Sequence, residues 1–302
     1  MGILIWRADF SRLMVAISDI DPIWLAGAFL IQIVGKLIWA WRWTVLLEIF
    51  DISVPYWHLV KGIYVGLFFG NFLPTGVGGD LYRGYWILNE KALYARSMFI
   101  IFIERFIGVV SLAYIALPPF LLLLTHELVS WDASLFLLPV LIGMCGGFLL
   151  LHPAVFDFWN EFLFHSNDRW LAGMRKKVSE ALHLLHQAGE RRWHITFLSL
   201  VLHLVGIAFF YFLGRSLGLE LAAWHYLVIV PLTVVATLLP ISLNGLGVRE
   251  GTLVLLIGIL SNDVDSSEAI ALGLLASVVG MLISLVGASF YIAGNNKEAY
   301  AA

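Results

Sequence analysis

The sequence predicts an all-α membrane protein built from several transmembrane helices. The chain has 302 residues, of which 61% are hydrophobic and only 13% are charged, and its mean hydropathy is +0.90. A soluble domain of this length could not hide so much apolar surface, so lipid must cover much of it. Unbroken apolar runs at 107–124 and 270–286 argue against a β-barrel, whose strands alternate in polarity.

Five stretches are long enough to cross a bilayer, which takes roughly 20 apolar residues. They are 22–46, 97–124, 131–151, 194–214 and 268–293. Two further apolar regions, 58–88 and 225–260, are interrupted in the middle, and each half is too short to cross. We expect each of these regions to form a re-entrant hairpin, which dips to mid-depth and returns to the side it entered.

The two interruptions resemble each other. Residues 73–83 read LPTGVGGDLYR and residues 239–249 read LPISLNGLGVR. Each begins with Leu-Pro, and each has a glycine five residues and an arginine nine residues after the proline. Broken apolar segments at corresponding positions of two halves point to the binding site of a transporter.

The distribution of Lys and Arg predicts the orientation, because these residues favour cytoplasmic loops. They occur in 83–96 and 152–193, whereas 125–130 and 261–267 contain none. The first group of loops should therefore be cytoplasmic, as should the C-terminus. With this orientation, the repeat 22–124 and the repeat 194–293 have opposite orientations, which is an inverted-topology repeat.

The remaining segments complete one integral membrane domain over 1–302, which we expect in the bacterial cytoplasmic (inner) membrane. Residues 125–193 should connect the repeats through one span and a cytoplasmic amphipathic segment. Residues 4–17 form either an interfacial helix or the end of a first membrane helix. A single cysteine, Cys145, allows no disulfide within the chain.

Ionisable residues lie in or beside the apolar segments, where each charge costs a few kcal/mol on insertion scales. They are Asp80, Arg83, Glu104, Arg105, Arg249 and Glu250, and Lys36 lies near the middle of the first span. Intramembrane charges usually mark a substrate pathway. Alternatively, these three acids and three arginines could neutralise one another as a structural network, since Asp80 and Arg83 are one helical turn apart.

Each interruption should present a helix N-terminus near mid-depth, which is a site for anions. Gly78 and Gly79 permit positive φ and close approach. Asp80 stands where the N-cap of a helix starting at Leu81 would stand, and Asn244 with Gly245 can play this part in the second motif. Arg83 and Arg249 would add donors suited to phosphate.

Other polar residues have simpler explanations. His203 could shuttle protons, but a hydrogen-bonded structural histidine is favoured. Arg42 is expected to anchor the inner interface, and Trp39, Trp41 and Trp43 to form an aromatic belt. The sequence predicts no metal site, because His183 and His186 lack nearby acids or cysteines at ligand spacing, and it predicts no cofactor.

Three segments resemble the signature motifs of the flippase-like family whose best-known branch is the transmembrane domain of lysylphosphatidylglycerol synthase. They read FFGNFLPTGVGGDLYRG, IERFIG and LPISLNGLGVREG. The resemblance implies a membrane protein that moves a lipid with a charged or glycosylated head group between leaflets. The family motifs fall on Asn71, Pro74, Gly78, Gly79, Asp80, Arg83, Glu104, Arg105, Pro240, Gly245, Gly247, Arg249, Glu250 and Gly251.

We therefore expect a flippase for a phosphate-bearing phospholipid, hopanoid-type or polyprenyl-linked lipid. Its substrate contacts would be Lys36, Asn71, Gly78, Gly79, Arg83, Arg105, Asn244, Gly245 and Arg249. Asp80, Glu104 and Glu250 would serve proton coupling or structural pairing. The alternatives are an intramembrane lipid-phosphate phosphatase or transferase, or a non-transporting subunit of an envelope-lipid synthase.

The expected partners follow from the same reading. They are a membrane lipid with an anionic head group, an envelope-lipid biosynthetic enzyme and a second copy of the chain. A net charge of −3 gives no reason to expect nucleic acid. The soluble synthase domain of the lysyl-lipid branch is absent from the sequence, so this chain is not expected to charge a lipid with lysine.

Overall fold

The computed structural model is α-helical throughout the residues it describes, which are 18–73, 77–88, 91–125, 187–238, 242, 245–261 and 263–293. Its helices are α3 (Pro22–Ile49), α4 (Tyr56–Gly70), α5 (Val77–Leu88), α6 (Lys91–Thr125), α10 (Glu190–Ser216), α11 (Ala223–Leu238), α12 (Val248–Leu260) and α13 (Ser266–Ala293). The predicted span 131–151, the amphipathic part of 152–193 and Asn244 lie outside the described residues.

Four helices are long and apolar enough to cross a membrane. They are α3, α10, α13 and the part Phe99–Pro119 of α6. These four coincide with the predicted spans 22–46, 97–124, 194–214 and 268–293, and so confirm that long apolar helices form there. Asp21 caps the first of them, because its side chain accepts a hydrogen bond from the N–H of Ile23 while Pro22 occupies the first turn.

Both interrupted regions are broken at their Leu-Pro motifs, as the sequence predicts. The helix α4 ends at Gly70 and α5 begins at Val77, while α11 ends at Leu238 and α12 begins at Val248. These four helices have between 12 and 16 residues, fewer than the roughly 20 that a span requires. Within each region the two short helices pack against each other, α4 against α5 and α11 against α12.

The pair α4 and α5 is antiparallel. Near its start, the ring of His58 lies 3.2 Å from the carbonyl oxygen of Trp86, close to the end of α5. Further along, the two backbones come into direct contact, because a Cβ atom at Gly79 would lie 2.5 Å from the carbonyl oxygen of Gly66 and 2.9 Å from the Cα of Gly70. The α5 helix therefore returns to the end of the molecule where α4 begins.

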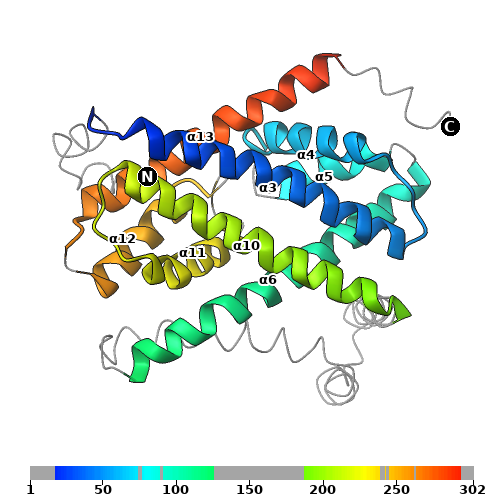
Figure 1. Cartoon of the computed structure of the whole chain (residues 1–302). Helices are drawn as coiled ribbons and strands as arrows, with labels where there is room; N and C mark the ends of the chain where they lie inside the picture. Colours follow the sequence, from blue (N-terminus) through cyan, green and yellow to red (C-terminus); the bar gives the residue numbers. More distant parts are fainter. Residues whose placement is uncertain are drawn as a thin grey trace.

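The long helices α3 and α10 are also antiparallel, and they cross the molecule side by side (Figure 1). At one end the N–H of Asp21 donates to the carbonyl of Ser216 over 2.9 Å. At the other end the guanidinium of Arg191 donates to the carbonyl of Glu48 over 3.4 Å. Glycine lets the two helices approach, since a Cβ atom at Gly35 would lie 2.9 Å from the side chain of Val205.

We call α3 to α6 the first half and α10 to α13 the second half. The helix contacts keep their pattern when the two halves are exchanged. The α4 helix packs on α13, and its counterpart α11 packs on α6. Likewise α3 with α4 matches α10 with α11, and α5 with α6 matches α12 with α13. In each half, the first helix of the broken pair therefore packs against the last long helix of the other half.

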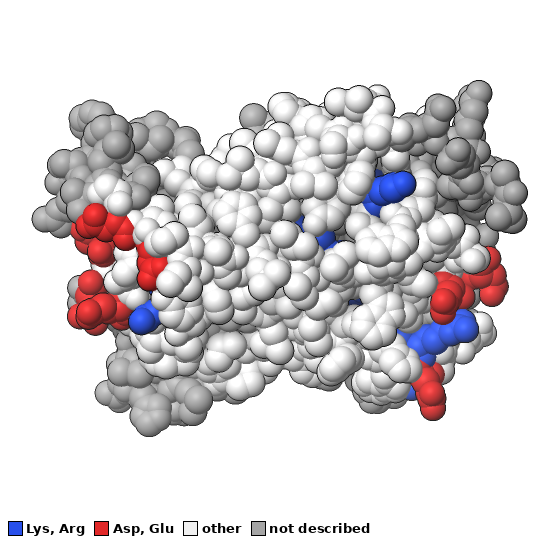
Figure 2. Space-filling model, turned by 45° about the horizontal axis from the view of Figure 1, so that its top comes forward, with Lys and Arg blue, Asp and Glu red and all other residues white. Residues whose placement is uncertain are grey.

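Charged side chains gather at the two ends of this bundle. Figure 2 shows acidic residues at both ends and none on this face of the broad band between them, where a few basic atoms are visible. Large apolar side chains on this bundle are exposed, among them Leu30, Phe197, Leu255 and Leu285. Such a band is the surface that a membrane-embedded helical protein presents to lipid.

Candidate functional site: a cation-rich cavity between the halves

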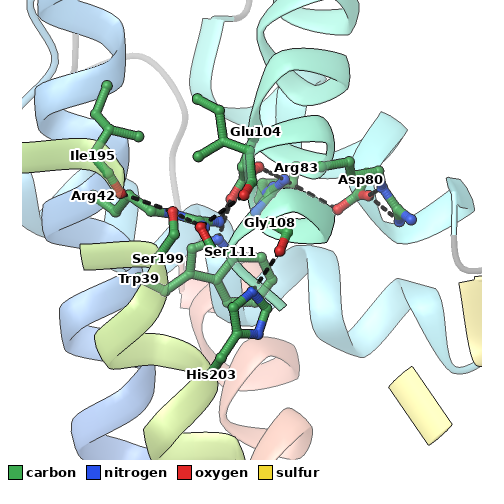
Figure 3. A network of polar contacts seen from close by, with 12 residues as sticks. Trp39, Arg42, Asp80, Arg83, Glu104, Gly108, Ser111, Ile195, Ser199 and His203 are labelled. Carbon is green, nitrogen blue, oxygen red and sulfur yellow. Dashed lines mark hydrogen bonds and ion pairs between the residues drawn. The ribbon is translucent and has the colours of Figure 1, made fainter. Parts of the chain in front are cut away.

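Five charged residues form a continuous chain of ion pairs inside the first half, which we call the ion chain. Its order is Arg42, Glu104, Arg83, Asp80, Arg105. Figure 3 labels the first four of these residues. Arg42 Nη2 lies 2.5 Å from Glu104 Oε1, and Arg83 Nη2 lies 2.6 Å from Glu104 Oε2. Arg83 Nη2 also lies 3.1 Å from Asp80 Oδ1, and Arg105 Nε donates to Asp80 Oδ2 over 2.7 Å.

The ion chain connects three helices. Arg42 comes from α3, Asp80 and Arg83 come from adjacent turns of α5, and Glu104 and Arg105 are neighbours on α6. The i, i+3 pair of Asp80 and Arg83 confirms the helical contact expected from their spacing. Because every link alternates in sign, each buried charge lies against an opposite one, as buried ions require.

Arg83 lies at the centre of the ion chain and is only 2% exposed. Its guanidinium carbon is 4.7 Å from the ring centre of Trp39 and 4.4 Å from that of Trp43, both on α3. Its Nε and Nη1 atoms have no hydrogen-bond acceptor among the described residues. The two ring faces therefore provide much of the stabilisation that these N–H groups would otherwise draw from acceptors.

Two expectations for α3 are wrong. Arg42 is not an interface anchor, because it is 7% exposed, pairs with Glu104 and donates to the hydroxyl of Ser199 over 3.0 Å. Trp39 and Trp43 do not form a belt, since Trp43 is fully buried and the Trp39 indole N–H donates to Glu104. Trp41, on another face of the helix, is exposed. The signal for this inward face was the spacing of Trp39, Arg42 and Trp43 at three and four residues.

The helix starts at the two motifs differ from those predicted. The α5 helix begins at Val77, so Asp80 belongs to its first turn rather than to the N-cap. Gly78 and Gly79 are helical and have no positive φ, and Gly79 serves close packing instead. In the second motif α12 begins at Val248, and Gly245 and Gly247 precede it with φ values of 79° and 83°.

The second half carries a smaller polar cluster on α12 and α13. Arg249 Nη1 donates to the hydroxyl of Ser277 over 2.6 Å. Glu250 is 1% exposed, and its Oε2 accepts the N–H of Gly247 over 2.6 Å at the start of α12. Ser277 also lies 3.3 Å from Glu250 Oε1. Glu250 thus closes the N-terminus of its own helix, which favours a negative charge.

A cavity of about 550 Å³ lies where the two halves meet, and every described helix contributes to its lining. Its charged lining residues are Lys36, Arg42, Asp80, Arg83, Glu104, Arg105 and Arg249. Five cations therefore face two carboxylates, an excess of three positive charges. Such an excess of positive charge in a cavity attracts an anion.

Most of the site residues that the sequence predicts line this one cavity. Asn71 and Gly79 line it together with the charged residues, and Asn71 Nδ2 donates to Ser284 of α13 over 2.6 Å. Gly78, Gly245 and Glu250 are not among the lining residues. Sequence reasoning missed Arg42 as a cavity residue.

His203 extends from α10, as Figure 3 shows, and it is one of the residues that line the cavity. Its Nε2 is 2.8 Å from the carbonyl oxygen of Gly108 on α6. Because a carbonyl oxygen only accepts, Nε2 carries the hydrogen and Nδ1 has a free lone pair in the neutral ring. This contact agrees with the interpretation of His203 as a hydrogen-bonded histidine.

The arrangement can hold an anion. Within the described ranges, no group of three or more His, Cys, Asp or Glu residues is placed to hold a metal ion. Besides its charged residues, the cavity has apolar lining residues, which include Ile63, Leu67, Leu112, Val205, Phe209 and Val230. A ligand with a charged head and an apolar body would suit both parts.

Comparison with known proteins identifies related sequences. The sequence profile of the family described as "Lysylphosphatidylglycerol synthase TM region" matches residues 1–287. A "UPF0104 membrane protein" of Methanothermobacter thermautotrophicus is 21% identical over 312 residues, which cover 94% of this chain and 88% of the relative. The "UPF0104 membrane protein PH1989" of Pyrococcus horikoshii is 25% identical over 126 residues, or 41% of this chain and 38% of the relative. No solved structure matches the chain significantly.

Proposed function

Since the chain belongs to the family of the lysylphosphatidylglycerol synthase transmembrane region, and is thus a multi-pass membrane protein, we propose that it moves a phosphate-bearing lipid between the leaflets of its membrane. The observation that carries this proposal is the cavity between the halves, with its excess of three cations. Charge buried among membrane helices is rare and costly, and it usually marks the path of a substrate.

The packing pattern supports an inverted repeat with two re-entrant hairpins. Both broken pairs consist of helices too short to cross, and exchange of the halves preserves the helix contacts. The antiparallel course of α3 and α10 fits two repeats of opposite orientation. In this arrangement the acidic loop 261–267 is external, and the C-terminus lies in the cytoplasm.

The head group would bind in the cavity while its tails remain in lipid. Arg105, whose side chain is 33% exposed, together with Lys36 and Arg249, would contact the phosphate. Arg83, being enclosed by Trp39, Trp43 and two carboxylates, would position α5 rather than bind the lipid. Proton coupling through Asp80 or Glu104 would require one of their pairs with arginine to open first, because these pairs favour the ionised carboxylate.

Reconstituted vesicles test the proposal. The protein is placed in liposomes that contain a trace of fluorescent phosphatidylglycerol, and a membrane-impermeant quencher reports the lipid that changes leaflet. We expect Arg249→Ala and Lys36→Gln to slow this movement at least about tenfold, since each removes a charge-assisted contact. Lys61→Gln, which changes an exposed lysine of α4, is the matched control and should keep the wild-type rate. Wild-type rates in both cavity variants would defeat the assignment.

An intramembrane phosphatase or transferase is the second candidate, because arginines around a phosphate suit that chemistry as well. Purified protein that released inorganic phosphate from a lipid phosphate would favour it. Stable co-purification with an envelope-lipid synthase, without lipid movement in vesicles, would instead indicate a subunit role.

A further inference from the structure

The carboxylates that line the cavity already bind arginine at every oxygen. Glu104 Oε1 pairs with Arg42 and Oε2 with Arg83, over 2.5 Å and 2.6 Å. Asp80 Oδ1 pairs with Arg83 over 3.1 Å, and its Oδ2 accepts from Arg105 over 2.7 Å. An ammonium group that reached either acid would share its oxygens with arginines, in a cavity whose lining already carries an excess of three positive charges.

Glu250 does not supply the missing acceptor. It is 1% exposed, is not among the lining residues, and accepts the N–H of Gly247 over 2.6 Å. Among the described residues, every carboxylate that lines the cavity is therefore already paired with arginine.

Lys36 shows the opposite imbalance. It lies in the middle of α3, lines the cavity, and has no carboxylate oxygen within ion-pair distance in the part of the chain described. Its one contact there is the ring of Trp39, with Nζ 5.6 Å from the ring centre. A cation held among membrane helices with so little compensation is stabilised when an anion binds beside it.

We infer that the cavity selects head groups by net charge: it accepts a phosphate head group that carries no ammonium, and it discriminates against ethanolamine and aminoacyl head groups. This inference rests on the proposed function and specifies its substrate class. A lysyl ester of phosphatidylglycerol, the product for which the family profile is described, belongs to the disfavoured class. Lys36 is the residue that determines the selection, because no acid of the ion chain neutralises it.

Thermal unfolding of the purified full-length protein measures this selection directly, since a ligand of the folded state raises Tm. Micelles are doped with phosphatidylglycerol, phosphatidylethanolamine or lysylphosphatidylglycerol of identical acyl chains. Phosphatidylglycerol should raise Tm most, phosphatidylethanolamine less, and the lysyl lipid not at all. A rise with the lysyl lipid or phosphatidylethanolamine that equals or exceeds the rise with phosphatidylglycerol would overturn the inference, as would no rise with any lipid.

Variants test the role of Lys36. Lys36→Gln should weaken the apparent affinity for phosphatidylglycerol about tenfold, as expected when one charge-assisted contact is lost. Lys36→Arg keeps the charge and should keep the order of the three lipids, and Lys61→Gln serves as the exposed control. An unchanged affinity in Lys36→Gln would refute the assignment to Lys36. If Lys36→Gln does not fold, the order of the lipids in the wild type and in Lys36→Arg still decides the charge selection.

Two further measurements separate this inference from the function on which it rests. Inorganic phosphate that raises Tm as much as phosphatidylglycerol would support charge selection, but would identify a free anion rather than a lipid as the ligand. In liposomes, movement of all three lipids at one rate would refute the selection and leave lipid transport standing. Selective binding with no lipid movement would refute transport and leave the selection standing.

Discussion

Arg83 joins two carboxylates with a single nitrogen, while two tryptophan rings cover its guanidinium. This geometry needs a planar, delocalised cation, because a flat guanidinium packs against aromatic rings and still donates at its edge. A lysine ammonium is compact and strongly hydrated, and it could not fill the same slot. Arg83 therefore acts as the central connection of α3, α5 and α6.

Replacement of this arginine tests its structural role. Arg83→Lys should lower the free energy of unfolding by about 3 kcal/mol, because Glu104 and Asp80 lose a buried partner. Thermal unfolding in detergent measures the change. The same substitution at the exposed Arg191 is the control and should leave Tm close to that of the wild type. Equal Tm values for the two variants would show that Arg83 does not hold the helices together.

At the scale of the element, the α4–α5 pair depends on direct contact between the two helix backbones. Glycines recur at every fourth position of α4, at 62, 66 and 70, and therefore share one face of the helix. Gly66 and Gly70 meet Gly79 of α5, and Gly62 meets the side chain of Ile87. Small residues at a membrane-helix interface allow this close packing. The contact at this face holds α5 where Asp80 and Arg83 line the cavity.

A single methyl group should separate these helices. In Gly79→Ala the new Cβ would lie 2.5 Å from the backbone oxygen of Gly66, which cannot move aside alone. We expect a loss of about 1–3 kcal/mol from overpacking, measured as a lower Tm, together with slower lipid movement. Gly258→Ala on α12 is the matched control, because nothing lies within 4 Å of its new methyl group. An equal Tm in both variants would contradict the predicted close contact.

At the scale of the whole molecule, the loops after α3 and after α12 lie at opposite ends. The C-terminal end of α10 adjoins the start of α3, and the chain continues from there through 217–222 into α11. The side chain of His225, near the start of α11, contacts the backbone of Leu260 at the end of α12. Asp51 follows α3 at its other end. The proposed topology therefore assigns Asp51 and Asp263 to different sides of the membrane.

Cysteine labelling in intact cells tests this assignment. In a Cys145→Ser background, which removes the single native cysteine, Asp263→Cys should react with a membrane-impermeant maleimide. Asp51→Cys should react only after the cells are opened. Both side chains are exposed, so a difference in labelling reports the side of the membrane rather than burial. Labelling of both positions in intact cells would contradict the proposed orientation.

The sequence predicted the long helices and the two breaks because these depend on local features. A run of about 20 apolar residues has one stable form in lipid, and Leu-Pro interrupts it. The start of α5 was missed by four residues, since Gly78 and Gly79 were interpreted as part of the turn before Leu81. Their helical state depends on the contact of Gly79 with Gly66, which lies on another helix.

The ionic residues themselves could be predicted, but their partners could not. Charges in apolar sequence single out Asp80, Arg83 and Glu104, whichever way the helices pack. Which arginine reaches Glu104 depends on the rotation of α3 about its axis, and that rotation is set by packing on α10. For this reason Arg42 was assigned to the membrane interface, although it lies at one end of the ion chain.

The unequal distribution of the ion chain has a further consequence. Two conformations that exchange the roles of the halves would be equal in energy if the halves were identical, and the protein would divide its time evenly between them. Arg42, Glu104, Arg83, Asp80 and Arg105 all belong to the first half. If the proposed repeats exchange roles during transport, this asymmetry would make the two conformations unequal in energy, with the ion chain as one source of the difference.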